Sequence, residues 1–109
     1  MAWLVSKGRV LASAEQAVGR GAKLRGLLGR DSFEGAFVIP SCRSVHTIGM
    51  RFPIDVAYLD ATGTVIRVRH MHRHRIDLPV RHAVTVVEGM AGSFERWELK
   101  VGDVLEVRE

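Results

Sequence analysis

The stretch Ile54-Asp55-Val56-Ala57-Tyr58-Leu59-Asp60-Ala61-Thr62-Gly63-Thr64-Val65-Ile66-Arg67-Val68-Arg69 contains two β-prone runs joined by a turn at Thr62-Gly63. β-Branched and aromatic residues favour strands, and a glycine turn between two such runs is typical of a hairpin. Alternate side chains of a strand face opposite sides, so Asp55 should share a face with Ala57 and Leu59. The stretch therefore predicts an antiparallel hairpin that carries a carboxylate among apolar neighbours.

Further β-prone runs lie on both sides of this hairpin, separated by glycine and proline turns. They cover residues 3–5, 9–12, 36–39, 83–87 and 104–107, and the first two form a second hairpin. Residues 13–18 fit either a helix start, because Ser13 and Gln16 have capping-box spacing, or a continuation of the preceding strand, which we favour. Short strands punctuated by turns predict a mainly β domain, built as a compact antiparallel β-barrel or sandwich.

Helical spacing is confined to two short segments. Three leucines between positions 24 and 28 form a narrow apolar stripe, which predicts one helix at about residues 20–28 that covers one open end or face of the sheet. A second helical turn is expected at residues 93–99, with Ser93 as its cap and with Phe94 and Trp97 facing inward.

Composition indicates one globular domain. The chain has 109 residues, of which 47% are hydrophobic and 26% are charged, so a single core over residues 1–109 is expected. No run approaches the roughly 20 apolar residues that span a bilayer, and residues 1–9 lack the apolar segment of a secretory signal. The one cysteine, Cys42, cannot form an intrachain disulfide, which suits a reducing compartment. We therefore expect a cytoplasmic protein without a membrane partner.

The net charge and the absence of nucleotide-binding motifs limit the classes of function that the sequence suggests. The net charge is +4 and the isoelectric point is about 10.0, which favours anionic partners without naming one. The chain contains neither GxGxxG nor GxxxxGK[ST], and it shows no parallel βαβ repetition. These observations argue against a nucleotide-binding α/β fold.

Several sequence blocks follow one another along nearly the whole chain. They are Gly26-Leu27-Leu28-Gly29-Arg30, the long block from His46 to Asp60, Gly63-Thr64-Val65-Ile66, Val87-Glu88-Gly89 with Ala91-Gly92, and Gly102-Asp103. In content and order they closely resemble the family called domain of unknown function 192. The resemblance implies a compact β-rich domain with a helix near the N-terminal third, and it implies no activity. Many members carry an N-terminal signal segment, a pattern from which this sequence departs.

The segment from Cys42 to Asp60 holds the most promising group of polar side chains. We expect it to fold back and to gather His46, Thr47, Met50, Arg51 and Asp55 around a polar pocket. Our leading hypothesis is a non-enzymatic accessory module that binds a small ligand or a protein at this pocket, without a cofactor. A buried Asp55 must be paired, so a hydrogen-bonded knot at the corner formed by residues 49–53 is the structural alternative to a direct role.

A hydrolase or transferase is the alternative from another class. In it, Cys42 or His46 acts as the reacting group and Asp55 assists. On an extended strand Cys42 and His46 would lie roughly 13 Å apart, so a direct hydrogen bond requires a bend between them. An inert, partly buried thiol is the more common outcome for a cysteine in apolar surroundings.

Residues 67–81 form the most basic window of the chain and give a third hypothesis, nucleic-acid binding. The window contains no aromatic residue to stack on bases, so we favour a charged strand edge that deters aggregation. The alternating His70, His72 and His74 would share one strand face, but the outer two would lie roughly 13 Å apart. We therefore expect no metal site.

Overall fold

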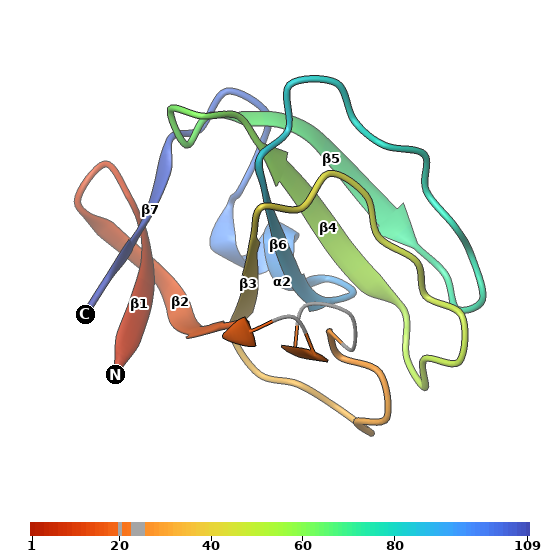
Figure 1. Cartoon of the computed structure of the whole chain (residues 1–109). Coiled ribbons are helices and arrows are strands. Elements are labelled where there is room, and N and C mark those ends of the chain that lie inside the picture. Colours follow the sequence, from red (N-terminus) through yellow and green to blue (C-terminus); the bar gives the residue numbers. More distant parts are fainter. Residues whose placement is uncertain (20, 23–25) are drawn as a thin grey trace.

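The computed structural model describes residues 1–19, 21–22 and 26–109, and within these residues seven strands form one sheet (Figure 1). The sheet order is β5-β4-β6-β3-β2-β1-β7. The strands are β1 (Ala2–Ser6), β2 (Arg9–Gln16), β3 (Ala36–Pro40), β4 (Ile54–Leu59), β5 (Val65–Met71), β6 (Thr85–Met90) and β7 (Leu105–Arg108), and the helix α2 (Ser93–Trp97) follows β6.

The strand predictions are confirmed with shifts of a few residues at some ends. β4 has the predicted bounds, and it pairs with β5 as an antiparallel hairpin. β1 and β2 form the second hairpin, whose turn residues Lys7 and Gly8 both have positive φ, at 51° and 77°. Such turns match the twist of the strands they join. β2 continues to Gln16, which confirms the strand interpretation of residues 13–16.

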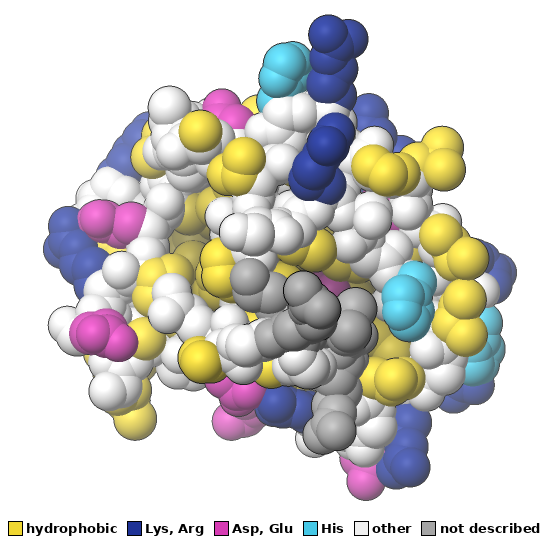
Figure 2. Space-filling view, viewed as in Figure 1, with side chains coloured by type: hydrophobic (Ala, Val, Ile, Leu, Met, Phe, Trp, Pro, Cys, Tyr) yellow, Lys and Arg dark blue, Asp and Glu magenta, His cyan; other side chains and the backbone are white. Residues whose placement is uncertain are grey.

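The prediction of a mainly β domain is confirmed, but of the two predicted forms, an antiparallel barrel or a sandwich, the barrel is wrong because the sheet is not closed, and one strand pair is not antiparallel. The edge strands β5 and β7 meet only at one corner, where Thr64 and Val104 form an isolated bridge, and they diverge from there (Figure 1). β2 and β3 are parallel, because residues 17–35 return the chain to the end of the sheet at which β2 began. The curled sheet leaves a hollow of about 300 Å³ between β7 and the strands β3 and β6, visible as an apolar recess in Figure 2.

Two apolar clusters lie on opposite faces of β4. Ile54, Val56 and Tyr58 pack into one, which we call the Tyr58 core, while Ala57 and Leu59 pack into the other, which we call the Trp97 core. All five side chains are at most 5% exposed. Asp55 hydrogen-bonds on the Trp97 side, which confirms the face predicted from strand alternation.

The helix α2 covers part of the Trp97 core. Phe94 and Trp97 are buried, as predicted, but the cap of the helix is Gly92 at φ 93°, not Ser93. Gly92 has no side chain to cap the helix, so the first N–H groups of α2 need a hydrogen-bond acceptor from another element.

The helix expected at about residues 20–28 falls in part outside the described residues, at positions 20 and 23–25. Of the described residues there, Leu27 is 1% exposed and belongs to the Tyr58 core. In the part of the chain that the structure describes, no helix has the length and apolar character needed to cross a membrane.

Candidate functional site

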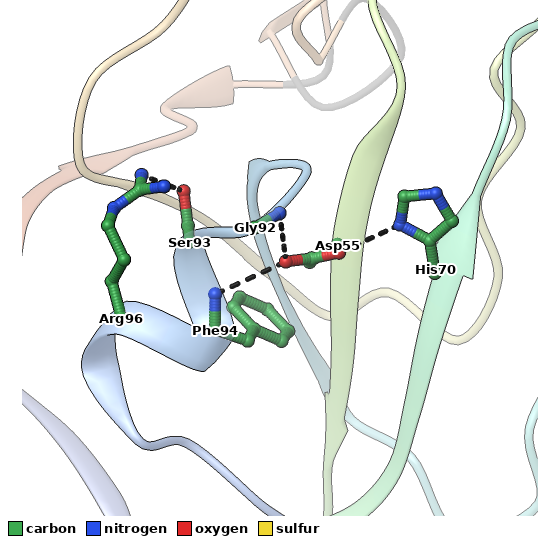
Figure 3. A network of polar contacts seen from close by, with 6 residues as sticks. All are labelled: Asp55, His70, Gly92, Ser93, Phe94 and Arg96. Carbon is green, nitrogen blue, oxygen red and sulfur yellow. Dashed lines mark hydrogen bonds and ion pairs between the residues drawn. The ribbon is translucent and has the colours of Figure 1, made fainter.

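Asp55 is the centre of a polar network that joins β4, β5 and α2 (Figure 3). Its Oδ2 accepts hydrogen bonds from the N–H groups of Gly92, at 2.9 Å, and Phe94, at 3.2 Å. Its Oδ1 lies 3.1 Å from Nδ1 of His70. The residue is 7% exposed, so its carboxylate is buried and satisfied on both oxygens.

This network explains how α2 begins without a cap of its own. The first N–H groups of a helix have no partner within the helix, and a carboxylate usually supplies one from the residue just before it. Here Asp55 does so from a neighbouring strand. The predicted structural knot therefore exists, but it ties β4 to α2 and β5, and not the corner at residues 49–53.

The five residues predicted to form a pocket lie in different surroundings. Thr47 is fully buried, where its hydroxyl donates to the carbonyl of His72 and accepts from the N–H of Arg75. Met50 packs into the Tyr58 core. Asp55 faces the Trp97 core, on the other side of the sheet from Met50.

The other two members of the predicted set are exposed. His46 forms an isolated bridge with Ile76, and Arg51 forms an exposed ion pair with Asp31 at 2.5 Å. Segment 42–60 thus turns as predicted, but its polar groups bond to separate elements and do not share a set of partners.

The proposed nucleophile, Cys42, and the proposed assisting carboxylate, Asp55, also bond to different groups. The Sγ of Cys42 donates to the carbonyl of Ser44, at 3.1 Å. The carboxylate of Asp55 orients His70 and not His46. An imidazole held by a carboxylate beside a thiol needs all three groups together, and this arrangement does not provide that set.

A different set of basic side chains gathers around the connection between β5 and β6. Arg67 projects from β5, and Arg81 and His82 come from the connection, which folds back beside that strand. With Asp60, Ile66, Pro79 and Val80 they line a hollow of about 440 Å³, which we call the cationic hollow. Figure 2 shows basic and histidine side chains standing out over this connection at the top of the view.

The one carboxylate at the cationic hollow is already engaged. Oδ1 of Asp60 accepts hydrogen bonds from the Thr62 hydroxyl, the Thr62 N–H and the Thr64 N–H. The Thr62 hydroxyl bond is the main cause that lowers the pKa of Asp60 below its usual value. By contrast, within the described residues neither Arg67 nor Arg81 forms an ion pair, and both are exposed.

Backbone strain marks the same hollow. His82 has φ 72°, a left-handed conformation that residues other than glycine rarely adopt. Such outliers cluster at functional sites, because the surrounding structure must hold them in place.

A buried phenol anchors the connection. The hydroxyl of Tyr58 donates to Oδ2 of Asp77 at 2.8 Å, and the same oxygen lies 3.6 Å from Nε of Arg69. Burial is the main cause that raises the pKa of Tyr58, and the bond to Asp77 adds to it. This contact ties the middle of the connection to β4, and so it positions the residues that follow.

The histidines of the basic window are spread along the chain. The rings of His70 and His72 make an edge contact, with centroids 5.0 Å apart, and Nδ1 of His74 accepts from the N–H of Gly49. Among the described residues, no three His, Cys, Asp or Glu side chains converge as a metal site would require.

The sequence indicated the arginines of the cationic hollow but not the hollow. Arg67 and Arg81 belong to the basic window, and β5 is indeed an edge strand. The hollow forms because residues 79–82 fold back beside β5, and no local sequence pattern predicts that contact. The positive φ of His82 is visible only in the structure.

Comparison with known proteins identifies relatives of the chain. The model of the DUF192 family, described as "Uncharacterized ACR", matches residues 2–107. UPF0127 proteins of Pyrococcus furiosus and Pyrococcus abyssi are 38% and 35% identical to it over 63 residues, or 58% of this chain. The match spans about half the length of these relatives, 54% in each.

Two solved structures share the fold. One is a protein of unknown function from Novosphingobium aromaticivorans, with a TM-score of 0.80 and 17% identity over 96% of this chain and 82% of that one. The other is a putative transcription regulator from Sinorhizobium meliloti, with a TM-score of 0.80 and 21% identity over 97% and 91% of the two chains.

Proposed function

This chain belongs to the DUF192 family, and we propose that it is a binding domain that holds a small anionic molecule in the cationic hollow. The observation that carries the proposal is the pair of exposed guanidinium groups, Arg67 and Arg81, that border a hollow of about 440 Å³ without forming an ion pair among the described residues. A volume in this range suits a small ligand.

The side chains that line the cationic hollow indicate which class of ligand it would bind. Guanidinium groups match the oxygen pairs of phosphate and carboxylate, and His82 adds a further hydrogen-bonding group. Ile66, Pro79 and Val80 supply apolar wall, which suits a ligand with a carbon skeleton. We therefore infer a phosphate- or carboxylate-bearing metabolite of small size.

The geometry favours this hollow over the segment from His46 to Asp55. There, Asp55 and Thr47 are saturated by bonds within the protein, and Arg51 is paired with Asp31. Groups that are already bonded must lose a partner before they can bind a ligand. The same saturation speaks against the hydrolase alternative, in which Asp55 must assist His46.

Titration with inorganic phosphate and with citrate, followed by calorimetry and by amide chemical shifts, tests the proposal. We expect saturable binding that shifts signals of residues 66–67 and 79–82 and that weakens as salt rises. The double variant R67A/R81A should lose at least tenfold in affinity. The double variant K100A/R108A, which removes the same charge from elsewhere on the surface, should bind like the parent.

Equal losses of affinity in the two double variants would show that net charge alone causes binding, and they would reject the cationic hollow as the binding site.

Duplex DNA is a second probe, because the Sinorhizobium neighbour is titled a putative transcription regulator. The absence of aromatic residues between positions 67 and 81 favours the small molecule. The proposal would be overturned if the protein bound duplex DNA with a steep salt dependence and did not bind citrate.

A further inference from the structure

The connection between β5 and β6 is bonded along its length to the segment that precedes β4 (Figure 1). Three backbone N–H groups donate across to carbonyls of the other segment, namely Thr47 to Arg75, Asp77 to Val45 and Val80 to Arg43. An antiparallel bridge between His46 and Ile76 lies among these bonds. Residues 43–48 and 73–80 thus form a two-stranded ribbon, which we call the basic ribbon.

The bond between Tyr58 and Asp77 decides which way the side chains of this ribbon point. Asp77 faces the core, where Oδ2 accepts from the Tyr58 hydroxyl at 2.8 Å. In an extended chain the neighbours of a residue face the opposite side, so Ile76 and Leu78 point to solvent. They are 71% and 78% exposed. The buried phenol therefore holds two large aliphatic side chains outward.

Ile48 adds a third aliphatic side chain to the same outer face. Its neighbour Thr47 is fully buried, whereas Ile48 is 49% exposed. Because His46 pairs with Ile76, Ile48 lies diagonally across the ribbon from Ile76. Figure 2 shows hydrophobic side chains over these segments, on the right of the view, with histidine and basic side chains around them. Exposed apolar side chains that gather in one place mark an interaction surface, whereas scattered ones do not.

The charge of the basic ribbon is positive on its outer face. Arg43, Arg73 and Arg75 are exposed, and within the described part of the chain none of them forms an ion pair. The one acid in the ribbon sequence is Asp77, which faces inward and lies 3.6 Å from Nε of Arg69. Aliphatic side chains and unpaired guanidinium groups therefore share this surface.

We propose that the outer face of the basic ribbon docks on the surface of an anionic phospholipid bilayer. Ile76 and Leu78 insert between the lipid headgroups, and the arginines contact the lipid phosphates. Proteins that bind at the membrane surface combine these two terms, buried apolar area and attraction to anionic lipid. The expectation of no membrane partner rested on the lack of a spanning segment, which has no bearing on surface binding.

Charge and side-chain type favour a bilayer over other partners. A second copy of the chain, docked face to face, would bring the arginines of both copies together, and like charges oppose such contact. Single-stranded nucleic acid would stack on aromatic side chains, whereas the exposed groups of this ribbon are aliphatic. A bilayer is soft, so it accepts protruding side chains without a preformed pocket.

Sedimentation of the protein with lipid vesicles tests the proposal. Vesicles of phosphatidylglycerol mixed with phosphatidylcholine should bind it at least tenfold more tightly than vesicles of phosphatidylcholine alone. Salt should weaken this binding without abolishing it, because salt screens the arginines but not the insertion of aliphatic side chains.

The orientation of the bound protein can be measured without any variant. In bicelles of the same two lipids, a nitroxide placed near the top of the lipid acyl chain broadens the amide signals that lie close to it. We expect the strongest broadening at Ile48 and at residues 76–78. The amides of Val10 and Val101, which are also exposed, should keep their intensity.

Two pairs of matched variants separate the terms. I76S/L78S should lose at least tenfold in vesicle affinity, whereas V10S/V101S, which removes exposed aliphatic side chains elsewhere, should bind like the parent. R73A/R75A should lose at least tenfold on anionic vesicles, and K100A/R108A, with the same net charge, less than threefold. I76S/L78S should still bind citrate, because neither residue lines the cationic hollow.

Three results would overturn the proposal. The first is a parent protein that does not sediment with anionic vesicles, including one that binds duplex DNA or polyglutamate instead. The second is an I76S/L78S variant that binds vesicles like the parent, or that loses no more affinity than V10S/V101S. The third is equal broadening of the amides at residues 76–78 and at Val10 and Val101.

Discussion

Asp55 and Glu88 are carboxylates on the adjacent strands β4 and β6, only one register step apart, yet their surroundings differ completely. Asp55 pairs across the ladder with Gly89, and Glu88 pairs with Val56. The first has a partner on each oxygen, and the second has a buried oxygen without one. The same sheet thus buries one acid as a structural fastener and the other as an unsatisfied group.

The contrast teaches where a function can reside. A carboxylate that already accepts two backbone N–H bonds and contacts an imidazole holds elements together, and it has little capacity left for a ligand. An isolated carboxylate destabilises the fold when ionised unless something binds to it. Four variants test whether the two acids differ in this way and whether exposed groups matter less than buried ones.

The largest effect is expected from Asp55→Ala. It leaves the N–H groups of Gly92 and Phe94 without their acceptor and His70 without its partner. Two orphaned groups predict a loss of about 4 kcal/mol in the free energy of unfolding, measured by urea denaturation. Asp55→Asn keeps an oxygen for these groups and should lose less than half as much. A loss below about 1 kcal/mol for the alanine variant would contradict the fastener role.

Glu88→Gln should have the opposite sign. The unfolded chain loses its Glu88 proton near pH 4.5, whereas the folded protein holds it to about pH 7. The folded state therefore binds more protons in this window, and stability falls as pH rises from 4.5 to 7. At pH 8 the glutamine variant should be more stable than the parent by about 3 kcal/mol, and at pH 4 the two should agree. Parallel stability curves over this range would refute the raised pKa.

Gly89→Ala tests the contact behind the Asp55 side. A Cβ at position 89 would lie 3.0 Å from the Trp97 ring and 3.1 Å from Cβ of Ser93. Neither neighbour is the end of a flexible chain, so α2 must move away from the sheet. We expect a loss of about 1–2 kcal/mol in the free energy of unfolding, with the largest amide shifts in β6 and α2. Gly8→Ala, which meets no atom within 4 Å, separates backbone strain from this crowding.

Asp31→Ala should have the smallest effect. It removes the ion pair with Arg51, whose two side chains are 59% and 84% exposed. Water and salt screen such pairs, so stability should change by less than about 0.5 kcal/mol. A larger change in thermal denaturation would show that this surface pair holds the segment before β4 in place, against the argument that only the buried carboxylates matter.

Much of the fold was predictable because strands leave a local pattern. The alternation in residues 54–59 placed β4 and assigned Asp55 to the face of Ala57 and Leu59, and the inward positions of Phe94 and Trp97 followed from helical spacing. The pairing of β2 with β3 was not predictable. It depends on which end of the sheet the chain enters at Ala36, and strand propensity carries no information about direction.

The candidate sites were harder to predict for the same reason. The sequence singled out Asp55 as a group that must be paired, but its partners, Gly92 and Phe94, lie 37 and 39 residues away. Arg67 and Arg81 were part of a basic window, but the hollow between them exists only because the connection folds back. Glu88 follows directly after the run predicted as a strand at residues 83–87, yet it lies inside β6, because this strand continues to Met90.

Local sequence patterns were enough to predict a small β-rich domain, most of its strands, and its membership of one family. Those properties follow from short-range patterns and from blocks that lie in order along the chain. Tertiary structure alone decided which polar groups are satisfied and which are left open. Hydrogen bonding and burial depend on residues brought together from distant positions, so Asp55 has a partner on each oxygen, whereas Glu88 keeps a buried oxygen without one among the described residues.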